Sequence, residues 1–198
     1  MPARNSEQRY GTVAMAFHWF IALLIAINLV LGFWFANIME HGDPSRFEVA
    51  QLHKSIGLTV LVLSVLRLVW RLINPVPPLP AEMSPSLRVA ARATHIMLYV
   101  FIIAVPLAGW AMVSASPLGS PTVYFGLFQW PHIGFLADMP RGTKVADKEA
   151  FEDTHAILAY ATLGLAVLHM LAAFYHQYSR HDDVLRRMLP GARVRSPA

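Results

Sequence analysis

Four long stretches of this sequence carry few or no charged side chains, and each is long enough to cross a lipid bilayer as a helix. No Asp, Glu, Lys or Arg occurs between Arg9 and Glu40, or between Arg92 and Asp138. A spanning helix needs about 20 mostly apolar residues at 1.5 Å of rise each. We therefore expect an all-α, integral membrane four-helix bundle in one domain. Its predicted spans are at about 13–38, 53–73, 92–113 and 154–178 of residues 1–198.

The composition supports this interpretation and limits the chemistry. Hydrophobic residues make up 56% of the chain and charged residues 14%, whereas a soluble domain carries about 25% charged residues. The first stretch is too long for a signal peptide, and three more follow it. There is no cysteine, which excludes disulfides, iron–sulfur clusters and covalently attached haem. Redox chemistry would therefore need a non-covalent cofactor.

Basic residues are concentrated at one end of the predicted bundle. That end combines the N-terminus, the 74–94 loop and the C-terminal tail, and it holds 11 of the 16 Lys and Arg residues but 4 of the 12 acidic ones. By the positive-inside rule, both termini are expected in the cytoplasm. The membrane explains the basic balance, so no nucleic-acid partner is expected. The 11 residues are Arg4, Arg9, Arg67, Arg71, Arg88, Arg92, Arg180, Arg186, Arg187, Arg193 and Arg195.

Histidines inside the spans are the main candidate functional residues. Ionisable side chains within a bilayer are costly and usually face the bundle interior. His18 and His169 fall in the cytoplasmic halves of the first and fourth spans, while His53 and His155 open the second and fourth spans at the outer side. His155 and His169 are fourteen residues apart, about 3.9 turns, so they share one helix face. Depth thus pairs His18 with His169 and His53 with His155.

Two such pairs are what two bis-imidazole haems require. An iron with both axial positions filled passes electrons and does not bind oxygen. We predict these four histidines as iron ligands of two haems stacked across the bilayer, with Gly57 and Gly164 giving the macrocycles clearance. For any one of these histidines, the alternative to an iron ligand is a hydrogen-bonded residue of the bundle core. Arg67, Arg71 and Lys54 are candidates to pair with haem propionates, and snorkelling to the interface is the alternative for the arginines.

A second group of candidates lies at the cytoplasmic end. Arg92 and His95 share a helix face, and His176 is seven residues beyond His169 on another. Histidines donate hydrogen bonds and exchange protons near neutral pH, as a quinone head requires. A ridge that binds lipid headgroups is the alternative. His95 also rivals His18 as the inner ligand, but it lies three residues from Arg92 and is expected to be too shallow to meet His169.

The connections between spans differ in kind. The segment 75–80 is proline-rich and predicts a stiff linker. Ser84 followed by Pro85 is typical of a helix N-terminus. The outer loop 114–153 is long, and its first half is aromatic and uncharged. That half is expected either to anchor the chain at the membrane surface or to fold over a site.

Several motifs together resemble the bacterial cytochrome b561 family. The resemblance extends from Arg9 to about Leu189, with order and spacing intact. It implies a membrane cytochrome with two haem b groups, and it implies the same four ligands. The motifs are Phe17-His18-Trp19, Leu52-His53-Lys54-Ser55-Ile56-Gly57, Val69-Trp70-Arg71, Ala90-Ala91-Arg92-Ala93-Thr94-His95, and the pair His155 and His169.

The resemblance also implies a function in the bacterial inner membrane. Members exchange electrons with the quinone pool, and some oxidise superoxide at the outer face and reduce ubiquinone. We therefore expect transmembrane electron transfer between quinone and a periplasmic donor or acceptor, and whether the chain is itself an enzyme depends on that outer substrate. One alternative is the haem-b anchor subunit of a hydrogenase or dehydrogenase. Another is a histidine-lined metal transporter. Such a transporter would usually add carboxylate or thiolate ligands, and the predicted spans contain no Asp, Glu or Cys.

Overall fold

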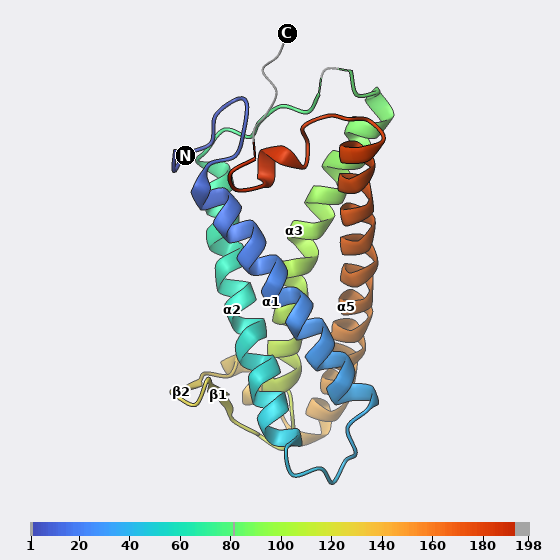
Figure 1. Cartoon of the computed structure of the whole chain (residues 1–198). Helices are drawn as coiled ribbons and strands as arrows, with labels where there is room; N and C mark the ends of the chain where they lie inside the picture. Colours follow the sequence, from blue (N-terminus) through green and yellow to red (C-terminus); the bar gives the residue numbers. More distant parts are fainter. Residues whose placement is uncertain (1, 81, 193–198) are drawn as a thin grey trace.

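The computed structural model describes residues 2–80 and 82–192. Four long helices run side by side: α1 (Thr12–Asn37), α2 (Arg46–Leu72), α3 (Pro85–Ser114) and α5 (Arg141–Tyr178) (Figure 1). All four are long and apolar enough to cross a membrane. The expected all-α four-helix membrane bundle is confirmed. Arg193 and Arg195, two of the basic residues counted above, lie outside the described residues.

Three of the helices begin well before the apolar stretches that predicted them. Helix α5 starts at Arg141, thirteen residues before the predicted span, and helix α3 starts at Pro85. The Ser84 side chain accepts a hydrogen bond from the backbone N–H of Leu87, and Pro85 takes the first helical position, as the sequence predicts. Polar residues continue these helices into the aqueous phase, so the outer connection is shorter than the predicted 114–153 loop.

The helices pack in a sequence of neighbours, α1 on α2, α2 on α3 and α3 on α5. A small apolar cluster of Ile21, Ile56 and Val60 joins α1 to α2. Large apolar side chains also cover the outside of the bundle: Val30, Leu72 and Val89 are each about two-thirds or more exposed. Such a surface is stable against lipid tails and not against water.

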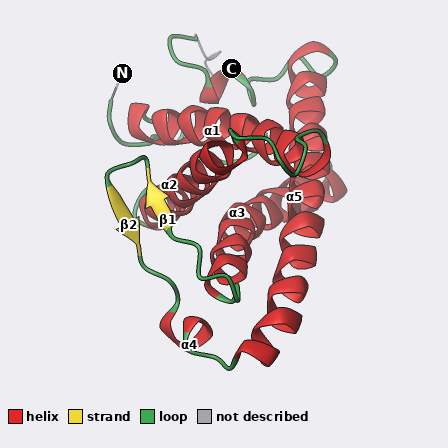
Figure 2. Cartoon of the chain, turned by 90° about the horizontal axis from the view of Figure 1, so that it is seen from below, coloured by secondary structure: helices red, strands yellow, loops and turns green. Residues whose placement is uncertain are grey.

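A small hairpin covers the outer end of α2. Strands β1 (Thr122–Tyr124) and β2 (Phe128–Trp130) pair antiparallel, and the short helix α4 (Gly134–Ala137) follows (Figure 2). The turn needs Gly126, whose φ is +76°. Gln51 on α2 donates to the Pro121 carbonyl and accepts from the N–H of Val123. These bonds fix the aromatic part of the outer loop onto the bundle.

The C-terminal segment closes the opposite end. After α5 the chain turns back and forms a short 3-10 helix, η1 (Arg186–Met188), beside the start of α1 (Figure 1). The indole N–H of Trp19 donates to the Met188 carbonyl over 2.8 Å, and the N–H of Tyr10 donates to the Arg187 carbonyl. The N-terminal segment, the 75–80 linker and the C-terminal segment therefore share one end, the one whose positive charge predicts the cytoplasmic side.

Candidate functional site

The outer pair of histidines meets inside the bundle. The ring centroids of His53 on α2 and His155 on α5 are 6.0 Å apart, with ring planes 82° to each other. The Nδ1 atom of His155 is 2.8 Å from the Val105 carbonyl of α3. Because a carbonyl only accepts, Nδ1 carries the proton and Nε2 keeps a lone pair. This arrangement is typical of a metal-ligating histidine held in orientation by a backbone carbonyl.

Two glycines that the sequence analysis missed make room for these rings. A Cβ atom on Gly32 would lie 2.9 Å from Cε1 of His53, and one on Gly109 would lie 3.0 Å from Cε1 and Nδ1 of His155. The missing Cβ of Gly57, the glycine expected to give a haem clearance, faces Asn28 of α1 and not a histidine ring. Depth matching, applied to glycines as it was to histidines, would have found Gly32 and Gly109 in the outer halves of their helices.

The inner site brings together three histidines. His18 on α1 and His169 on α5 have ring centroids 6.3 Å apart, and His95 on α3 lies 5.3 Å from His169. The expectation that His95 is too shallow to meet His169 is therefore wrong. Helix α3 begins ten residues before His95, which places this histidine about 15 Å along the helix axis. Arg92, three residues before His95, is exposed, and its position therefore made His95 look closer to the membrane surface than it is.

Arg67 reaches the inner cluster. One of its terminal nitrogens is 3.1 Å from Nδ1 of His18, and its guanidinium carbon lies 5.2 Å from the centre of the Tyr99 ring. Arg71 lies over the same ring at 5.4 Å. Arg67 and Arg71, the two candidate propionate partners at this end, therefore both contact the ring of Tyr99 on α3. Lys54 instead donates to the Pro121 carbonyl of the outer loop over 3.1 Å.

The candidate quinone residues lie at the inner end but in different surroundings. Nδ1 of His176 is 2.6 Å from a carboxylate oxygen of Asp182, in the turn that follows α5. His95 faces the inner histidines, whereas Arg92 is exposed. No periodic pattern in the sequence relates Asp182 to His176, because the two meet only where the tail folds back after α5.

The two histidine pairs fit the dimensions of a metal bound between imidazoles. Metal–imidazole bonds are about 2 Å long and a ring nitrogen lies about 1 Å from the ring centroid, so two imidazoles on one metal have centroids roughly 6 Å apart. The observed separations are 6.0 Å and 6.3 Å. Each pair also spans helices that are not the closely packed neighbours of the bundle. The centroid spacing of each pair therefore matches that of two imidazoles on one metal ion.

Comparison with known proteins gives consistent results over almost the whole chain. The family model for prokaryotic cytochrome b561 matches residues 9–191. The chain is 35% identical to cytochrome b561 homolog 2 of Escherichia coli K12, over 96% of this chain and 95% of that protein. It is 29% identical to the probable superoxide oxidase CybB of Yersinia pestis, covering 94% and 99%. It is 27% identical to cytochrome b562 of Cereibacter sphaeroides, covering 93% and 98%.

The family match and the four helices able to span a membrane together identify a membrane electron-transfer cytochrome. The chain belongs to the prokaryotic cytochrome b561 family. It is a multi-pass protein of the bacterial inner membrane, and its family function is electron transfer with haem b.

Proposed function

We propose that this protein carries electrons across the inner membrane through two bis-histidine haems. The inner haem is held by His18 and His169, and the outer one by His53 and His155. The observation that carries the proposal is the presence of two interior histidine pairs, in separate layers, with centroid separations of 6.3 Å and 6.0 Å. When bound, haem supplies a one-electron carrier whose iron has no open axial position.

The residues around each pair have positioning roles in this proposal. The Val105 carbonyl holds His155 with Nε2 directed away from α3. Gly32 and Gly109 allow the outer rings to lie against helix backbones. Arg67 and Arg71 place positive charge beside the inner pair, where they would neutralise carboxylates of a haem.

At the inner end we place the quinone, near His95, Arg92 and His176. Quinone takes up two electrons and two protons to become quinol, and histidine side chains can relay those protons. The pair of His176 and Asp182 strengthens this assignment, because a carboxylate that accepts from one ring nitrogen orients the other.

At the outer end we propose superoxide as an electron donor. A relative that aligns over 94% of this chain is named a probable superoxide oxidase. Two superoxide anions oxidised to two molecules of oxygen release the two electrons that one quinone accepts. Lys54, half-buried next to His53, supplies positive charge at the outer pair, which attracts anionic donors.

The test is a haem assay combined with a kinetic assay on purified protein. A pyridine haemochrome determination should give two haem b per chain, and the reduced protein should show the sharp α band of six-coordinate haem. Addition of a superoxide source should reduce the haems, and added ubiquinone should reoxidise them. One haem per chain would remove a histidine pair from the proposal. No haem would favour the metal transporter, and haem that responds only to a co-purifying periplasmic subunit would favour the anchor.

A further inference from the structure

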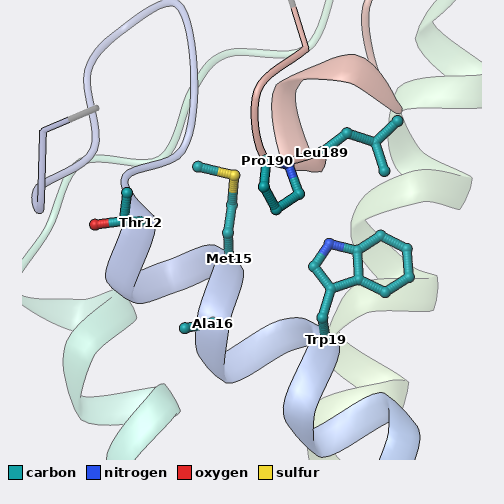
Figure 3. Close-up of a pocket in the computed structure, with 6 residues that line it drawn as sticks. All are labelled: Thr12, Met15, Ala16, Trp19, Leu189 and Pro190. Carbon is teal, nitrogen blue, oxygen red and sulfur yellow. The ribbon is translucent and has the colours of Figure 1, made fainter.

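An apolar groove lies between α1 and the C-terminal segment, and the ring of one lining residue, Trp19, has its centroid 5.0 Å from that of the inner ligand candidate His18. It has a volume of about 480 Å³ and is lined by six residues. Figure 3 shows the Trp19 indole and the Met15 side chain on α1 directed toward Leu189 and Pro190 of the returning chain. This volume lies in the range of small-molecule sites, about 300–1,000 Å³. The lining residues are Thr12, Met15, Ala16, Trp19, Leu189 and Pro190.

The groove is a built feature of the fold. The wall formed by the C-terminal segment is held in place by two contacts. The Trp19 indole donates a hydrogen bond to the Met188 carbonyl, and the Arg9 guanidinium lies 3.5 Å from the Leu189 carbonyl. Its floor is Met15, only 2% exposed. Phe20 and Leu23, four and seven residues beyond Ala16 on the same face of α1, have exposed side chains.

The depth of the groove matches the region where a lipid chain enters the bilayer. From Thr12 to Trp19 the helix rises about 10 Å. Tryptophan is enriched at the membrane–water interface, and Trp19 here lies at the deeper end of the groove. A hydrocarbon chain that starts beside Thr12 would therefore pass Ala16 and Trp19 and continue along the lipid-facing surface of α1.

The charge at the mouth of the groove is complementary to a phosphate. The Arg9 guanidinium contacts the carbonyl of the wall residue Leu189, and Arg9 lies three residues before α1. Glu7 is the acidic residue of the same N-terminal segment. Among the described residues of the inner end, nine basic residues oppose four acidic ones. Each basic residue at a membrane surface adds about 1 kcal/mol of attraction for anionic lipid.

We propose that this groove binds one anionic phospholipid of the cytoplasmic leaflet. One acyl chain occupies the groove between Met15, Trp19 and Leu189, and the phosphate lies beside the guanidinium of Arg9. The bound lipid joins the start of α1 to the C-terminal segment.

The test uses phosphatidylglycerol added to delipidated holoprotein, with binding followed by native mass spectrometry. One copy should bind more tightly than phosphatidylcholine by about tenfold or more. Ala16→Trp, which fills the groove, should weaken phosphatidylglycerol binding by at least that factor. Arg9→Gln should remove the preference for the anionic lipid. The matched controls are Ala26→Trp, on the lipid-facing side of the same helix, and Arg180→Gln, a basic residue at the same end.

Three outcomes would overturn the proposal. Equal binding of the two lipids would show that the phosphate is not recognised. Unchanged binding in Ala16→Trp, or an equal loss in Ala26→Trp, would show that the groove is not the site. Displacement of phosphatidylglycerol by added ubiquinone would assign the groove to a quinone tail. Haem content, measured in every variant, checks that each one is folded.

Discussion

Arg67 lies 3.1 Å from Nδ1 of His18, and this contact determines which atom of the histidine holds the proton. A guanidinium only donates, so Nδ1 accepts and the neutral ring carries its proton on Nε2. An iron bound at Nε2 needs the lone pair of that atom. Ligation by His18 therefore requires Arg67 to leave Nδ1, and a haem propionate is the acceptor that the guanidinium would then find.

Replacement of Arg67 is expected to lower the midpoint potential of the inner haem. Reduction adds an electron, and a buried positive charge stabilises the reduced form. Arg67→Gln should lower the potential by roughly 50–100 mV, about 1–2 kcal/mol at an effective dielectric constant near 20. Arg67→Lys should retain most of the effect. Spectroelectrochemical titration of the two haems measures both shifts.

The control for this experiment is Arg46→Gln. Arg46 is at the outer end, where it donates to the carbonyls of Phe35 and Met39. The Arg46→Gln variant should leave the midpoint potential of the inner haem unchanged. A shift of both haems by the same amount in Arg67→Gln would contradict a local role for Arg67.

Single alanine variants of the three inner histidines should identify the ligand pair. The centroid separation of His18 and His169, 6.3 Å, has room for a metal, whereas the 5.3 Å between His95 and His169 is short of the roughly 6 Å required. We expect His18→Ala and His169→Ala each to retain one haem per chain and His95→Ala to retain two. The opposite result for His18 and His95 would make His95 the ligand.

Gly109 should be required for the outer haem alone. Its missing Cβ would lie 3.0 Å from the His155 ring, so the branched side chain of Gly109→Val would displace that ring. Overpacking of this kind costs about 1–3 kcal/mol. We expect loss of most of the outer haem with the inner α band intact. Gly142→Val, at a position with open space around it, is the control. Equal loss of the inner and the outer haem in Gly109→Val would indicate general unfolding instead.

Helix number and histidine depth could be predicted from the sequence because both follow from simple counting. Uncharged stretches of about 20 residues define spans, and 1.5 Å per residue places His53 level with His155 and His18 level with His169. Counting fails for His95, because distance from the nearest arginine is a poor measure of depth when that arginine is exposed and helix α3 begins ten residues before the histidine.

The remaining features depend on tertiary contacts that leave no periodic signal. The outer hairpin is held by Gln51 and Ser55 of α2, residues that are unremarkable polar positions in the sequence. The return of the tail, which brings Met188 to Trp19 and Asp182 to His176, joins segments that no hydrophobic pattern relates. The cytoplasmic groove and the carboxylate beside His176 could therefore be found only in three dimensions.

Proton exchange with quinone at the inner end should depend on His95 and His176. His95 and His176 are replaced singly with leucine, and Asp182→Asn removes the carboxylate 2.6 Å from His176. Two haems per chain should remain in each variant, while reduction of the haems by a quinol slows about tenfold or more, as expected for loss of a proton-transfer group. Asp182→Asn should slow the reaction less than His176→Leu, because it disturbs the orientation of the ring and leaves the ring in place. His132→Gln, in the outer connection, serves as the control. Full haem content with unchanged quinol kinetics in the His95 and His176 variants would contradict this site and would favour a quinone at the outer end, under the aromatic segment 124–135.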